Sequence, residues 1–403
     1  MDLPQLPLTC ASQGAVAAYW RAVDAQLHAW PGVQDALALA LREAPDFALA
    51  HALHALVLGA WGKGPEARDT AARACVLAAK ATSREIAHCA IVALIVSGRT
   101  GDALAAVLQH AKAHADDALM MATAMGAYGL FAFSGRADHN EARLAFVDNL
   151  APHYATDLPW LLANRGWARI ELGQVAQGLA MAQQAMRQRP NNGHNAHIVM
   201  HGFFEAAQPQ AALDFAAHWL PSYPDNGLLW GHIHWHAALA EIDLDHAGLA
   251  MQRLTGPILN YLPRGAPFMG LADIASLPWF LSQRGQSGLP WAIAQKHIDD
   301  YFPKGANVFG ELHLAMVAAA RRERSALVAS GERLDALANA GHEGAPVARQ
   351  WVAGLLALLD GDAEQAQVAL AACAASELRL GGSHAQRSVI EATRQSLRLP
   401  STN

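Results

Sequence analysis

Apolar residues recur at helical spacing along most of the chain, and short breaks rich in glycine or proline separate the runs. Trp20, Val23 and Leu27 follow one another at intervals of three and four residues, which predicts an amphipathic helix. Pro31 and Gly32 then mark its end. No segment shows the strict alternation that a half-buried strand requires. The pattern therefore predicts an all-α chain.

The predicted helices come in pairs joined by short turns. The clearest pair is WLLANRGWARIELGQVAQGLAMAQQAMRQRP, residues 160–190, in which small residues recur where two helices cross closely. The sequence around Pro190 returns around Pro224, 34 residues later, which is the period of a helix-turn-helix repeat. We expect one α-solenoid domain over residues 1–403, strongly curved or closed. Its repeats are clearest over 45–245, and residues 246–403 are irregular.

Composition narrows the classes of function. The chain is 53% hydrophobic and 16% charged, with a formal net charge of −6, so it lacks the basic field of a nucleic-acid binder. Its four cysteines have no metal-finger spacing. The beginning MDLPQLPLTCASQ lacks the basic region of a secretory signal, and no apolar run is long enough to cross a bilayer. We expect a cytoplasmic protein that binds neither nucleic acid nor membrane.

Histidine is the residue type that suggests chemistry. His197 and His201 lie four residues apart, as do His232 and His236, and this spacing places each pair on one face of a helix. The second pair follows the first by 35 residues, so both occupy nearly the same place in successive repeats. Four imidazoles are candidate ligands for zinc, iron or manganese. Alternatively, each histidine belongs to the core and bonds to a neighbour.

Two acidic residues are further candidates. Glu85 and His88 have the i, i+3 spacing of carboxylate metal centres in helical bundles, although Glu85 also suits a helix start after Ser83 as N-cap. Asp273 either caps a helix or faces the histidines, where it would hold one imidazole in a fixed tautomer.

Three more residues are candidate ligand contacts. Trp235, between two histidines, walls a pocket or belongs to the core, and His313 is a further candidate for the same pocket. Arg387 follows a glycine turn, where it either holds an anionic ligand group or ties the last helix to the preceding repeats.

Several motifs together resemble the tetratricopeptide repeat protein 38 family. They are PDFALAH (45–51), SREIAH (83–88), HIVMH (197–201), HIHWHAAL (232–239), DIASLPW (273–279), FGELH (309–313) and LGGSHAQR (380–387). The resemblance covers nearly the whole chain and implies divergent tetratricopeptide helices, without implying an activity. The family pattern falls on His51, Arg84, Glu85, His88, His197, His201, His232, Trp235, His236, Asp273, His313, Ser383, Gln386 and Arg387. Family members carry a polar residue just after the second histidine of the first pair, where this chain has Gly202, so Glu205 is a doubtful site residue.

Two functions follow from these observations. The first is an enzyme that acts on a small polar molecule in a histidine-lined pocket, by acid/base or metal-assisted hydrolysis or elimination. The second is a non-catalytic scaffold that binds a peptide or protein partner, as tetratricopeptide arrays do. The apolar, histidine-bearing faces favour the small-molecule pocket.

Overall fold

The computed structural model describes residues 3–397, and every regular element within that range is helical. The predicted all-α class is confirmed. Contacts divide the chain into two units: unit 1 comprises residues 1–131, 141–202 and 219–229, and unit 2 comprises residues 132–140, 203–218 and 230–403. The single domain expected over residues 1–403 stays a prediction. No helix between residues 3 and 397 combines the length and apolarity that a bilayer crossing requires.

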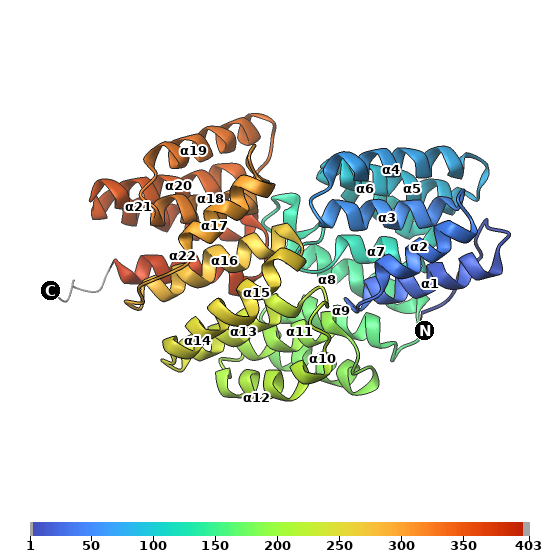
Figure 1. Cartoon of the computed structure of the whole chain (residues 1–403), viewed down its shortest axis with the longest axis horizontal. Helices are drawn as coiled ribbons and strands as arrows, with labels where there is room; N and C mark the ends of the chain where they lie inside the picture. Colours follow the sequence, from blue (N-terminus) through green and yellow to red (C-terminus); the bar gives the residue numbers. More distant parts are fainter. Residues whose placement is uncertain (1–2, 398–403) are drawn as a thin grey trace. The chain divides into compact units, whose positions relative to one another are not determined.

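Unit 1 is built from helices that pack in sequential pairs, α1 with α2, α3 with α4, α5 with α6 and α9 with α10 (Figure 1). Its elements are α1 (Gln13–Leu27), α2 (Val33–Glu43), α3 (Ala48–Ala60), α4 (Gly64–Leu77), α5 (Ser83–Val96), α6 (Thr100–His114), α7 (Ala118–Ala124), α9 (Pro159–Ile170), α10 (Val175–Gln188), and most of α8 (His139–Leu150) and α11 (Gly193–Glu205).

Glycine residues allow α9 and α10 to cross closely. A Cβ on Gly166 of α9 would lie 2.7 Å from the carbonyl oxygen of Gly178, and a Cβ on Gly178 of α10 would lie 2.5 Å from the carbonyl oxygen of Gly166. Between the two helices, Gly173 has a φ of 77°, which favours glycine over other residues. The small residues predicted to allow a tight crossing in residues 160–190 do so.

Unit 2 continues the pairing of helices with one irregular connection. Its elements are most of α12 (Pro209–Trp219), α13 (Trp230–Asp243), α14 (Ala247–Arg253), α15 (Leu259–Tyr261), α16 (Pro267–Ser282), α17 (Trp291–Tyr301), α18 (Val308–Ala320), α19 (Arg324–Asn339), α20 (Ala345–Asp360), α21 (Ala363–Ala374) and α22 (His384–Ser396). The connection between α14 and α16 contains a π-helical turn, Leu254–Ile258, with Pro257 inside it. Proline removes a backbone donor there, which explains why only short helices form.

Candidate functional site

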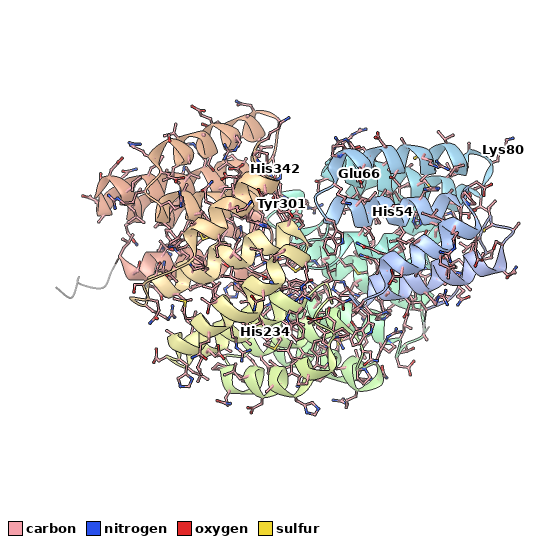
Figure 2. The ribbon with its side chains drawn as sticks, in the orientation of Figure 1. His54, Glu66, Lys80, His234, Tyr301 and His342 are labelled. Carbon is pink, nitrogen blue, oxygen red and sulfur yellow. The ribbon has the colours of Figure 1, made fainter. Side chains whose placement is uncertain are left out.

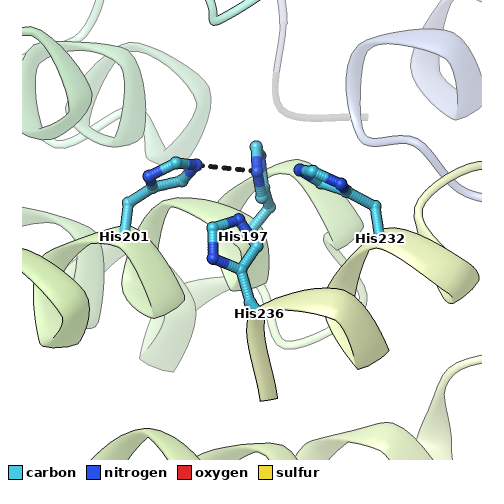
Figure 3. Close-up of side chains that lie close together, drawn as sticks. All are labelled: His197, His201, His232 and His236. Carbon is cyan, nitrogen blue, oxygen red and sulfur yellow. Dashed lines mark hydrogen bonds between the residues drawn. The ribbon is translucent and has the colours of Figure 1, made fainter. Parts of the chain in front are cut away.

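The first histidine pair lies on α11. Nε2 of His201 is 2.9 Å from Nε2 of His197, a hydrogen bond between two imidazoles one helical turn apart (Figure 3). His201 has no exposed surface and His197 is 9% exposed. One nitrogen must donate and the other accept, so two neutral rings here hold opposite tautomers. The predicted placement of both rings on one helix face is confirmed.

Trp167 of α9 and Glu171, the C-cap of that helix, lie beside this pair. The indole of Trp167 stacks on His197, with centroids 6.2 Å apart and planes at 27°, and meets His201 edge-on at 4.6 Å. Oε1 of Glu171 lies 4.0 Å from Nδ1 of His201, and both side chains are fully buried. Sequence reasoning missed both Trp167 and Glu171. Their spacing of four residues is the signal that would have placed them together.

The second histidine pair lies on α13 in unit 2. Nδ1 of His232 donates a 2.7 Å hydrogen bond to Oδ1 of Asp273. The centroids of His232 and His236, the two rings drawn from α13 in Figure 3, are 4.9 Å apart. Asp273 lies inside α16, whose N-cap is Ala266. Asp273 therefore does not cap α16, and its carboxylate bonds the imidazole of His232, while its predicted role as a site residue stays a prediction. Burial raises the pKa of Asp273, and the nearby His232 opposes that rise.

Trp235 belongs to the core beside this pair. Its ring stacks on His232 at a centroid distance of 5.2 Å and an interplanar angle of 9°, and it is 1% exposed. Its Nε1 donates to Oγ of Ser276 at 3.0 Å. The indole therefore packs against one side of the His232 ring, and its predicted role as a ligand contact stays a prediction.

His234, the middle histidine of HIHWH, takes part in a separate set of hydrogen bonds. Nη1 of Arg253 donates to Nδ1 of His234 at 3.1 Å, and the same arginine pairs with Glu241 at 2.7 Å. His234 is labelled in Figure 2. Burial, with a smaller contribution from Arg253, lowers the pKa of His234 to about 4. His234 is thus a neutral acceptor in a structural network.

A small cavity adjoins His232 and Asp273. Its volume is about 10 Å³, room for at most one water molecule. It is lined by Gly231, His232, Ile258, Tyr261, Leu262, Gly265, Ala266, Met269, Gly270, Asp273 and Ile274. A substrate does not fit in this space.

Glu85 and His88 have different partners, so the predicted shared metal centre is corrected. Thr82, one residue before the expected Ser83, is the N-cap of α5, and it forms a capping box with Glu85. Glu85 also accepts hydrogen bonds from N and Oγ1 of Thr9, at 2.8 and 2.6 Å. Burial alone would raise the pKa of Glu85, but the bonds from Thr9 and Thr82 lower it. The carboxylate is fully used by the chain itself.

His88 contributes instead to a buried cluster around Asp117. Oδ2 of Asp117 accepts from Nδ1 of His88 at 3.0 Å and from Nε2 of His110 at 3.1 Å, and Nη1 of Arg84 lies 3.5 Å away. Burial alone would raise the pKa of Asp117, but His88, His110 and Arg84 hold it well below its usual range. The sequence did not indicate Asp117 and His110, because His110 lies on α6 and Asp117 is the N-cap of α7, whereas helical spacing relates only residues within α5.

The remaining candidates are structural. Nδ1 of His313 donates to the carbonyl of Phe309 at 2.8 Å, and burial lowers the pKa of His313 to about 4. Nη1 of Arg387 donates to the carbonyl of Gly382 at 2.8 Å, within the turn that Ser383 and Gln386 close as a capping box. Arg387 thus stabilises the turn that precedes its own helix, and its predicted roles, holding an anionic ligand group or tying the last helix to the preceding repeats, stay predictions.

His51, from the family pattern, and Glu205, the doubtful site residue, also have partners in the chain. Nε2 of His51 donates to the carbonyl of Pro45 at 2.9 Å. Glu205 accepts a 2.8 Å hydrogen bond from Nδ1 of His384 within unit 2. Both contacts fix local structure.

Comparisons with known proteins find two solved structures at low similarity. No protein-family model matches the sequence. The tetratricopeptide repeat domain of P58(IPK) is 14% identical, over 96% of this chain and 90% of that one, with a TM-score of 0.23. The structure of Naa15/Naa10 bound to HypK-THB is 12% identical, over 95% of this chain and 62% of that one, also with a TM-score of 0.23. At TM-scores this low, neither likeness supports a conclusion about this chain.

The expected hydrolase or lyase is wrong. The cavity beside His232 and Asp273 holds no more than a water molecule, and Glu85, His88, His313 and Arg387 form hydrogen bonds with other groups of the chain.

Proposed function

We propose that this protein is a non-catalytic, tetratricopeptide-like scaffold that binds a peptide or protein partner. The observation that carries the proposal is that unit 1 already holds a peptide segment on its helices through main-chain groups. Nη2 of Arg84 donates to the carbonyl of Pro7 at 2.7 Å, and the N–H of Thr9 donates to Oε1 of Glu85 at 2.8 Å. Main-chain groups are common to all peptides, so these two side chains suit recognition of a backbone.

The experiment is affinity capture followed by mass spectrometry, with the tagged full chain and two variants. Arg84→Gln removes the donor to Pro7, and Arg99→Gln is the matched control, because Arg99 pairs only locally with Asp102 on the surface of α6 and its N-cap. We expect a protein retained by the wild type and the control, and depleted with Arg84→Gln. A chain that retains nothing beyond the tag alone contradicts the proposal.

We propose in addition that each of the two histidine pairs, within its own unit, binds a divalent metal. Two nitrogens bound to tetrahedral zinc at about 2.0–2.1 Å lie roughly 3.3 Å apart, close to the 2.9 Å between His197 and His201. Each pair also has a carboxylate near the Nδ1 of one ring, Glu171 for His201 and Asp273 for His232. Such carboxylates orient metal-bound imidazoles.

Membership of the tetratricopeptide repeat protein 38 family also stays a proposal. It is supported by the order of seven motifs along the sequence, from PDFALAH to LGGSHAQR.

A further inference from the structure

The segment Leu3–Cys10, which we term the N-terminal strap, lies on the helices of unit 1 without forming a helix or strand. Leu3 is buried in the core of the unit, and Leu6, Leu8 and Cys10 are partly buried against it. Pro7 and Thr9, which alternate with them, are exposed. This period of two is the pattern of an extended peptide with one side facing a surface.

The surface beneath the strap combines an apolar floor with polar groups. Tyr19, Trp20 and Val23 of α1 line a small cavity together with Leu3, Pro4 and Leu6 of the strap and Leu119 of α7. Its volume is about 10 Å³, so the strap fills the site closely. Arg84 and Asp117 border the same cavity.

Arg84 and Glu85 form hydrogen bonds with main-chain groups of the strap that are two residues apart. Arg84 bonds the carbonyl of Pro7, and Glu85 bonds the N–H of Thr9, so one acceptor and one donor of the strap are satisfied. The hydroxyl of Thr9 adds a third bond, to Oε2 of Glu85 at 2.6 Å. Charge-assisted bonds of this kind are stronger than neutral ones.

Other side chains of unit 1 hold Arg84 and Glu85 in position. Asp117, fixed by hydrogen bonds from His88 and His110, faces the guanidinium of Arg84. Thr82 fixes Glu85 through the capping box of α5. A side chain that is already oriented loses little freedom on binding, so this surface is preorganised for a peptide.

We infer that the strap occupies the binding surface of a protein partner and competes with an extended, proline-containing segment of that partner. This inference rests on the proposed scaffold function and names the partner's chemistry. The matching segment carries aliphatic side chains at alternate positions, as Leu6 and Leu8 do around Pro7. It also presents a carbonyl and an N–H two residues apart to Arg84 and Glu85.

The test uses a fluorescein-labelled peptide with the sequence of residues 3–10 and the full chain in three forms. These are the wild type, a strap variant with Leu6→Ser and Thr9→Ala, and the control Gln5→Ala, whose residue is exposed. Where the strap occupies the site, the apparent affinity for the labelled peptide is the intrinsic affinity multiplied by the fraction of molecules whose site is free. We expect fluorescence anisotropy to give at least tenfold tighter binding to the strap variant than to the wild type or the control.

A second change checks that the peptide takes the place of the strap. Glu85→Gln, added to the strap variant, preserves the capping box because glutamine also serves at that position. It removes the charge that strengthens the bonds to residue 9, and we expect it to weaken peptide binding at least tenfold. Equal binding by the wild type and the strap variant, binding by neither, or no effect of Glu85→Gln overturns the inference. The affinity capture tests the scaffold function separately. If it retains a partner while the anisotropy experiment gives any of these contrary results, the scaffold function holds and only the inference about the strap fails.

Discussion

Asp117 accepts a 3.0 Å hydrogen bond from Nδ1 of His88 in the interior of unit 1, although 29 residues separate them in the sequence. The same carboxylate oxygen accepts from His110 and faces Arg84. One buried anion thus joins α5, α6 and the start of α7. Removing it leaves a buried guanidinium and two imidazoles without their acceptor.

Asp117→Asn is therefore expected to destabilise the protein by about 3–5 kcal/mol, the usual cost of breaking a buried ion pair from one side. The pKa of Asp117 is lowered in the fold. Its stabilisation is thus complete above the unfolded value of about 3.9 and is lost as pH falls below it. Urea unfolding at pH 7 and at lower pH measures both effects. Asp116→Asn is the matched control, and equal stability of the two variants contradicts this role of Asp117.

His313 predicts a second pH dependence. Burial lowers its pKa from 6.5 to about 4, so the unfolded chain binds a proton in this range that the folded chain does not. Stability should fall as pH drops from 6.5 to 4, by on the order of 3 kcal/mol for this residue. His313→Gln should reduce the slope of unfolding free energy against pH, whereas His218→Gln, at an exposed position, should leave it unchanged. An unchanged slope in His313→Gln would show that His313 is protonated in the fold.

Gly166→Ala tests the crossing of α9 and α10. The added methyl group would meet the backbone of Gly178 at 2.7 Å, so the helices must separate. We expect a loss of about 1–3 kcal/mol, typical of overpacking, visible as a lower midpoint in thermal or urea unfolding. Gly101→Ala near the start of α6 meets nothing within 4 Å and should be neutral or slightly stabilising. A Gly166→Ala protein as stable as the wild type would contradict the close crossing.

Zinc should stabilise the wild type if the histidine pairs are ligands. Free zinc at 100 times its dissociation constant adds about 2.7 kcal/mol to stability, measurable as a higher thermal midpoint. His201→Ala and His236→Ala should each reduce the zinc response and the metal bound per chain by elemental analysis. His153→Ala, at an exposed site, serves as the control. A wild type that is metal-free and insensitive to zinc, iron and manganese rules out the ligand role.

Local sequence spacing decided the helices and the contacts within them. Residues three or four apart on a helix share a face, so the pairing of His197 with His201 and the small residues at Gly166 and Gly178 could be predicted. The glycine turns between paired helices follow from the same local chemistry. These features depend on a few neighbouring residues and were therefore readable from the sequence.

The partners of the polar side chains were decided by the tertiary structure. Glu85 bonds Thr9 across 76 residues, His232 bonds Asp273 across 41, and His88 bonds Asp117 across 29. Periodicity describes which face of a helix a residue occupies, but it carries no information about what packs against that face. The sequence by itself determined a helical repeat with aligned histidines. Only the packing of distant segments decided that a carboxylate holds one imidazole and that a strap fills the surface above Arg84.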